Sequence, residues 1–257
     1  MTTAAQTAEL ARRSVVRTLR QPANVVAPML FPLMLLAVNA AGLDSAEQLP
    51  GFPTASFLAF ALAVPFIQGA LFATMNAGTD LARDVQTGFL NRLALSPMHS
   101  TALLAGQLGG VVLIGLAQAV FYLGVGLAAG VRLESGVLGA FVLLLLSGLF
   151  ALSFGSLGAF AALRTGSGEA VQGLFPVLFV FLFISSMNMP RELIEIDWFR
   201  TAATLNPVSY LLEGVRSLII VGWDAQALAL AFGFAIALGV AGLTAASWAL
   251  RLRLTRT

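Results

Sequence analysis

The sequence predicts an all-α integral membrane protein with six transmembrane helices, and composition, apolar run length and chain length together support this. Of its 257 residues 58% are hydrophobic and 10% are charged, with a mean hydropathy of +0.90. A soluble domain carries roughly 25% charged residues. Each helical span takes about 20 apolar residues. The chain is therefore long enough for six spans and little else, and any energy-converting domain is expected on another chain.

The six predicted spans follow one another with short connections. An amphipathic N-terminal helix over residues 1–22 precedes them, and its four arginines either flank the first span or hold an interfacial helix against anionic headgroups. The first span could instead be the core of a signal peptide, with Val38-Asn39-Ala40 as a cleavage site. In the third span, Gly106 and Gly110 have the spacing of small residues at close helix contacts. The predicted spans are residues 23–41, 52–79, 101–129, 137–163, 169–187 and 225–250.

Arginine distribution predicts the orientation of the chain. Ten of the 14 arginines lie in the N-terminal flank, the segment 80–100, the turn at Arg164 and the C-terminal tail. Basic residues are retained on the cytoplasmic side of a membrane. We therefore expect a multi-pass protein of the plasma membrane with both termini in the cytoplasm.

Composition also excludes several functions. All basic residues are arginine, so the phosphate-binding loop GxxxxGK[ST], which requires lysine, is absent and the chain is not expected to hydrolyse ATP. It has no cysteine and one histidine, His99, so neither a metal site nor thiol catalysis is expected. No basic run is interleaved with aromatic residues, which argues against nucleic acid as a partner.

The segment 80–100 is the longest polar interruption in the first two thirds of the chain. Its apolar residues recur every four positions, which predicts one amphipathic helix punctuated by Gly88 and by Ser96-Pro97. Such a helix would lie on the membrane surface or in the groove of a partner. The alternative is an ordinary solvated connection. The apolar positions are Leu81, Val85, Phe89 and Leu93.

The segment 188–224 mixes charged residues, two tryptophans and apolar patches that are too short to span a bilayer. Asn206-Pro207 interrupts any helix there. Segments of this composition are interfacial or re-entrant. The arginine distribution predicts that this segment lies on the outer side.

Two stretches resemble the membrane subunits of ABC exporters, in the branch that contains drug-resistance and polysaccharide-export permeases, and most closely the daunorubicin-resistance type. One runs from Asp84 to Pro97, DVQTGFLNRLALSP, followed by Gly106-Gln107. The other comprises Trp198-Phe199, LNPV at 205–208 and EGVRSL at 213–218. Both stand in the family's order, with the predicted spans between and around them.

The resemblance implies a dimeric permease of the type V exporter fold. A cytosolic ATP-binding subunit, in two copies, would carry ATP and Mg²⁺ and dock on the segment 80–100 as a coupling helix. This chain would bind no cofactor, and the outer segment would form re-entrant helices. The implied coupling residues are Asp80, Arg83, Asp84, Gly88, Phe89, Arg92, Leu93, Ser96 and Pro97, and the outer ones are Trp198, Asn206, Pro207, Glu213 and Arg216. Here Asp84-Val-Gln replaces a more acidic stretch common in relatives.

Three other functions compete with the exporter. A secondary transporter or channel would need an ionisable residue well inside a span, and the predicted spans have none. An intramembrane enzyme would need HExxH, GxSxG or a serine with a histidine in reach. A permease-like regulator that moves nothing stays open. The substrate is expected to be hydrophobic or amphipathic: a drug, a lipid or a lipid-linked glycan. Phenylalanines in spans more often serve core or lipid-facing packing, but the candidate path residues are Phe31, Phe66, Phe175, Phe179 and Phe183.

Overall fold

The structure is a computed structural model that describes residues 3–94 and 100–254. That part of the chain folds into helices joined by short connections and contains no strand, so the all-α prediction is confirmed. Five helices are long and apolar enough to cross a membrane, which makes the chain a multi-pass membrane protein. They are α2 (Ala23–Gly42), α4 (Ala63–Gln86) extended by the short α3 (Phe57–Ala61), α6 (Ser100–Ala128), α7 (Gly136–Thr165) and α12 (Ala225–Leu254).

The predicted fifth span is the one that differs. Residues 169–187 form α8 (Gly168–Gln172) and α9 (Leu174–Phe183), which meet at Gly173. Pro176 explains the break, because its ring nitrogen cannot donate to the carbonyl of Gln172. The ten residues of α9 reach only about 15 Å, half of a bilayer core.

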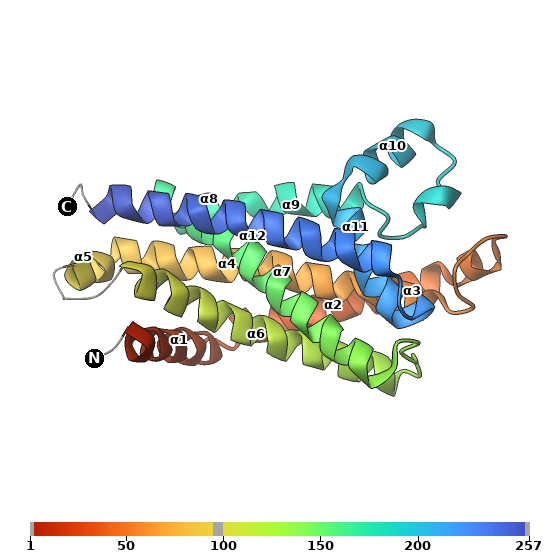
Figure 1. The fold of residues 1–257 in the computed structure, drawn as a ribbon, viewed down its shortest axis with the longest axis horizontal. Coiled ribbons are helices and arrows are strands. Elements are labelled where there is room, and N and C mark those ends of the chain that lie inside the picture. Colours follow the sequence, from red (N-terminus) through yellow and green to blue (C-terminus); the bar gives the residue numbers. More distant parts are fainter. Residues whose placement is uncertain (1–2, 95–99, 255–257) are drawn as a thin grey trace.

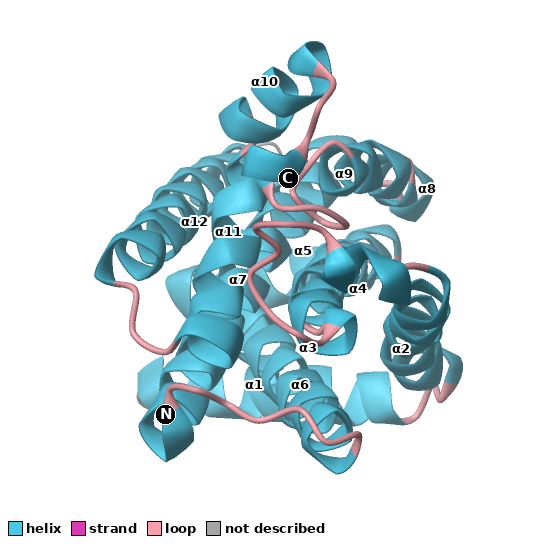
Figure 2. Cartoon of the chain, turned by 90° about the vertical axis from the view of Figure 1, so that its right-hand side faces the viewer, coloured by secondary structure: helices cyan, strands magenta, loops and turns pink. Residues whose placement is uncertain are grey.

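Helix α4 lies at the centre of the bundle. Viewed along the bundle, it is surrounded by its neighbours (Figure 2), and it contacts α2, α6, α7, α8, α9 and α11 (Pro207–Arg216). Its span is 89% buried, whereas those of α2 and α12 are only 17% and 22% buried. The apolar outer faces of α2 and α12 are therefore left for lipid or another subunit.

Glycines bring α4 and α7 into direct backbone contact. A Cβ atom on Gly158 would lie 1.9 Å from the carbonyl oxygen of Thr74, and one on Gly78 would lie 2.8 Å from the carbonyl oxygen of Gly158. At the same crossing, the Thr74 hydroxyl donates to the carbonyl oxygen of Phe154 at 2.9 Å. Only glycine permits this approach, which is how small residues associate helices in membranes.

Helix α1 (Thr3–Leu19) packs lengthwise on the first half of α6. The predicted glycine pair makes this contact: a Cβ on Gly106 would lie 2.4 Å from the Cβ of Leu10, and one on Gly110 would lie 2.5 Å from the Cβ of Ser14. The N-terminal segment thus joins the bundle through a close helix contact.

Two prolines interrupt the hydrogen-bond ladder of α2. Pro32 has no N–H to give to the carbonyl of Pro28, four residues earlier. The buried hydroxyl of Tyr122, on α6, donates to that carbonyl oxygen at 2.5 Å. A side chain of a neighbouring helix therefore satisfies the group that proline left unpaired.

Both termini, α5 (Phe89–Ala94) and the turn between α7 and α8 lie at one end of the bundle, which we call the α5 end (Figure 1). The opposite end, which we call the α3 end, carries α3, the turn between α6 and α7, and α10 (Asp197–Leu205), which stands away from the bundle (Figure 1). The arginine-rich segments of the sequence thus gather at the α5 end.

Replacement of Gly158 by alanine is expected to destabilise the bundle by about 1–3 kcal/mol, because the added methyl group overpacks the crossing. Thermal melting followed by tryptophan fluorescence in detergent measures this. Gly233→Ala in α12 is the matched control, since a Cβ there meets no atom within 4 Å. Equal melting temperatures for the two variants would contradict the close crossing.

Single cysteines test the orientation, because the chain has none of its own. The exposed residues Ser45, at the α3 end, and Thr87, at the α5 end, are the sites to substitute. Ser45→Cys is expected to react with a membrane-impermeant maleimide in intact cells, and Thr87→Cys only after lysis. The reverse pattern would overturn the predicted topology.

Candidate functional sites

The segment 80–100 is not one amphipathic helix. Asp80 to Gln86 are the last two turns of α4, and Gly88, with φ +68°, ends that helix and starts α5. A side chain at Gly88 would be strained in this left-handed conformation. The sequence predicted one helix punctuated at Gly88, whereas a single glycine in the left-handed region divides it into two helices despite the regular apolar spacing.

Four charged residues join α1 to the end of α4. The Arg13 guanidinium donates to both oxygens of Asp84 at 3.0 and 3.1 Å. Arg17 donates to Asp84 at 3.0 Å and lies 3.3 Å from the carboxylate of Asp80. Only 6% of the Asp84 side chain is exposed, and the two arginines pair with it where water cannot.

The spacing of the charged residues in the sequence carries a signal for this cluster. Arg13 and Arg17 are one helical turn apart, and so are Asp80 and Asp84. Two helices that pass in opposite directions bring such pairs into register, one arginine to each aspartate. The sequence prediction placed these arginines at the membrane border, as a flank of the first span or on an interfacial helix, and gave them no partner within the chain.

The pairing separates the predicted coupling residues into two groups. The carboxylates of Asp80 and Asp84 are directed to α1, whereas Arg83 and Arg92 are exposed. Phe89 is half-buried beneath the guanidinium of Arg13, which lies 3.8 Å from the ring centre, and the neighbouring Leu90 is buried. The side chain of Leu93 and residues Ser96 and Pro97 lie outside the described residues.

Asp84→Asn is expected to destabilise the chain by about 1–3 kcal/mol, because it leaves two arginines facing an amide. The destabilisation is at the lower end of this range if water solvates Arg13 after the substitution, since 38% of its side chain is exposed. A double-mutant cycle with Arg17→Gln, read by thermal melting, gives the coupling energy. Strictly additive losses would show that the contact contributes nothing.

Asn206 starts α11 at the α3 end. Its side-chain oxygen accepts from the backbone N–H of Val208 at 3.0 Å, and Pro207 takes the first helical position, where no N–H is needed. Its amide donates to the carbonyl oxygens of Phe181 and Ile184 at 2.5 and 2.8 Å. One side chain thus caps α11 and closes the end of α9.

Arg216 is buried at the other end of α11, with 4% of its surface exposed. It donates through Nε to the Phe60 carbonyl at 3.1 Å, and through Nη1 and Nη2 to the carbonyls of Ser186 and Met187, both at 2.6 Å. Its guanidinium also covers the Phe60 ring at 3.5 Å. Burial lowers the pKa of Arg216 to about 9, so the group is charged at pH 7.

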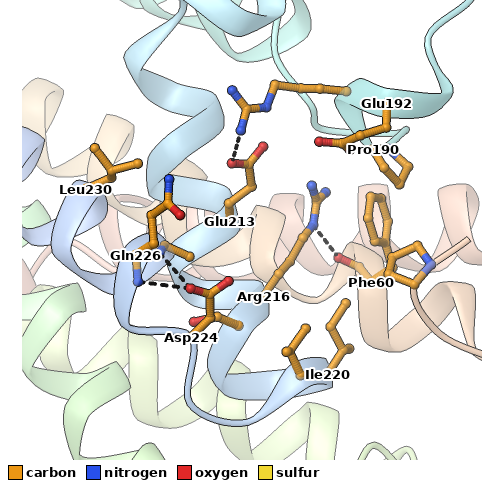
Figure 3. A pocket seen from close by; sticks show the side chains of 14 residues that line it. Phe60, Pro190, Glu192, Glu213, Arg216, Ile220, Asp224, Gln226 and Leu230 are labelled. Carbon is orange, nitrogen blue, oxygen red and sulfur yellow. Dashed lines mark hydrogen bonds and ion pairs between the residues drawn. The ribbon is translucent and has the colours of Figure 1, made fainter.

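Glu213 lies one turn before Arg216 but pairs elsewhere. Its carboxylate accepts from Nη2 of Arg191 at 2.6 Å. Burial raises the pKa of Glu213, while the charge of Arg191 opposes that rise. Figure 3 shows Glu213 and Arg216 turned toward one pocket. Trp198, by contrast, lies on α10 and is 68% exposed.

The candidate path phenylalanines are only partly brought together. Phe175 and Phe179 lie 4.5 Å apart between ring centres, and Phe31 and Phe183 each lie within 6.3 Å of Phe179. This half-exposed aromatic cluster joins α2 to α9. Phe66 is separate: it is buried against Tyr122, which indicates packing.

A bundle of long apolar helices with its charged residues gathered in two terminal clusters defines a multi-pass helical membrane protein. The chain belongs to the ABC-2 type transporter family, whose model matches residues 5–220. This confirms the family resemblance, and the match includes both ends of the bundle described above.

Individual relatives agree with the family. The chain is 31% identical over 206 residues to a daunorubicin resistance ABC transporter permease protein, DrrB1, of Streptomyces coeruleorubidus, which covers 76% of this chain and 66% of that protein. It is 28% identical over 221 residues to a putative transport permease, ycf38, of Pyropia yezoensis, which covers 84% of this chain and 74% of that protein.

Proposed function

We propose that this chain is the permease subunit of an ATP-driven exporter of the plasma membrane. A separate cytosolic ATP-binding subunit would bind ATP and Mg²⁺ and supply the energy. Two permease copies and two ATP-binding subunits would form the transporter, with the α5 end in the cytoplasm. Helices α8 and α9 would together form the fifth of six spans, and the segment 188–224 would be the outer re-entrant segment.

The observation that carries this proposal is the attachment of α5 to α4. The short helix follows α4 after the turn at Gly88, and α4 is the most buried helix and touches most of the others. A displacement of α5 would therefore pass to the centre of the bundle. The ion pairs of Asp80 and Asp84 tie α1 to the same end of α4, so α1 would move with it.

The exposed cations of this end offer a contact surface. Arg83 and Arg92 face outward on either side of the Gly88 turn. Phe89, which starts α5 and lies under the guanidinium of Arg13, would be the aromatic anchor of the contact. An acidic groove on the ATP-binding subunit would complement this surface.

The apolar surface supports a second permease copy and a hydrophobic or amphipathic substrate. Helices α2 and α12 leave most of their span exposed, and the aromatic cluster opens between α2 and α9. Interfaces between copies are enriched in such aromatic side chains. A relative named for daunorubicin resistance favours a drug-like substrate among the candidates.

Charge reversal of both cations, Arg83→Glu with Arg92→Glu, is expected to weaken association with the ATP-binding subunit about tenfold, because like charges would then meet. Co-purification and ATP hydrolysis by the complex measure this, and export in vesicles separates a transporter from a regulator. Arg200→Glu, an exposed arginine of the α3 end, is the control. Unchanged association in the double variant would exclude this docking surface.

A further inference from the structure

Two small cavities follow one another along the contact of α4 with α6. The first, which we call the Thr18 cavity, lies between α1, α4 and α6 and includes Thr18 and Asp80 in its lining. The second, which we call the Ser147 cavity, lies between α4, α6 and α7 and includes Ser147 and Tyr122. Each offers about 10 Å³ to the centre of a water molecule. On this measure about 10–15 Å³ holds one water.

Gln118, on α6, is the polar side chain that the two cavities share. Only 3% of it is exposed, and its Nε2 has no acceptor within residues 3–94 and 100–254. A Cβ on Gly69 would lie 3.6 Å from Oε1 of Gln118 and 3.7 Å from the hydroxyl oxygen of Tyr122, so the carboxamide reaches the wall of the Ser147 cavity. A buried amide donor without an acceptor is destabilising, and in native structures water often satisfies such a group.

Four other polar groups of the two cavities have acceptor capacity to spare. The hydroxyls of Thr18, Tyr122 and Ser147 each donate their proton to a backbone carbonyl, at 3.1, 2.5 and 2.8 Å, and their oxygens retain lone pairs. The carboxylate of Asp80 can only accept. An unused donor therefore shares each cavity with oxygens that lack a donor, and a molecule that both accepts and donates would join them.

Charge balance indicates that this molecule is neutral. Among the described residues that line the two cavities, Asp80 is the one charged side chain, and Arg17 lies 3.3 Å from its carboxylate. A bound cation or anion would add a charge that no group in the cavity compensates. Water carries no charge and forms about three hydrogen bonds at a buried site.

We propose that each cavity binds one water molecule and that the carboxamide of Gln118 donates one N–H to each. In the Thr18 cavity the water donates to the oxygens of Thr18 and Asp80. In the Ser147 cavity it donates to the oxygens of Tyr122 and Ser147. Each water then makes about three hydrogen bonds, the usual number for a buried water. Gln118 is thereby joined to α1 and α4 on one side and to α7 on the other.

The two waters distinguish the contact of α4 with α6 from the crossing of α4 with α7. Backbone contact at Gly158 holds the crossing at a fixed distance. A bridging water, by contrast, is nearly as favourable as a direct hydrogen bond and can follow the groups that it joins. Helix α6 can therefore shift against α4 without leaving Gln118 unpaired. This property belongs to the chain itself and does not depend on an ATP-binding subunit.

Radiolytic labelling of the purified chain tests the proposal, with water as the probe. X-rays convert a bound water into hydroxyl radicals, which oxidise the side chains beside it. The buried residues Tyr122 and Val111 report on the Ser147 and Thr18 cavities, and Phe150 and Val64, which are buried and line neither cavity, are their dry controls. We expect each reporter to be oxidised at least about tenfold faster than its control. Equal rates would overturn the proposal.

Three substitutions assign the waters to their partners. Gln118→Leu removes the amide and is expected to reduce oxidation of both reporters to the level of their controls. Thr18→Val removes only a hydroxyl and is expected to reduce oxidation of Val111 but not of Tyr122, because Thr18 lines one cavity. Gln68→Leu, at a buried glutamine of α4 that lines neither cavity, is the matched control and is expected to change neither rate.

Wild-type oxidation of both reporters in Gln118→Leu would overturn the assignment of the waters to this residue. Loss of both signals in Thr18→Val would also overturn it, because oxidation would then follow the packing of α1 and not a bound water. Thermal melting identifies any variant that does not fold. The comparison of Tyr122 with Phe150 in the wild-type chain needs no substitution and decides the proposal by itself.

Discussion

The backbone contact between α4 and α7 determines the spacing of the bundle. A carbonyl of α4 occupies the space that a side chain of Gly158 would need, so the backbones of the two helices touch at this crossing. Lipid tails are as apolar as the helices, and packing of this kind is what holds helices together there. With α4 fixed on α7, the other helices are arranged around α4, and its extensions at the α5 end and the α3 end acquire defined neighbours.

The two ends of the bundle accommodate buried charge in different ways. At the α5 end, buried carboxylates are matched by arginines of α1, so the charges cancel pairwise. At the α3 end, Arg216 is surrounded by carbonyl dipoles and an aromatic ring, which satisfy its donors without cancelling its charge.

Sequence reasoning located the helices better than the contacts between them. Length and hydropathy predicted the bounds of α2, α6, α7 and α12 within a few residues. A long apolar run identifies such a helix in the sequence without any knowledge of what it packs against. The breaks depended on single residues: Pro176 divides the fifth span, and Gly88 separates α5 from α4. The role of Arg191 could not be predicted, since it depends on a loop that returns to a helix more than 20 residues later.

The bond from Tyr122 to the carbonyl of Pro28 has a mechanical consequence. Helix α2 turns most of its surface away from the protein, and its prolines weaken it near this carbonyl. In hydrocarbon no water is available to replace the Tyr122 hydroxyl as donor to this carbonyl, so breaking the hydrogen bond costs free energy. Bending of α2 next to the bond leaves it intact and avoids that cost. The bond is therefore a pivot: the two halves of α2 can incline about a point that stays fixed to α6.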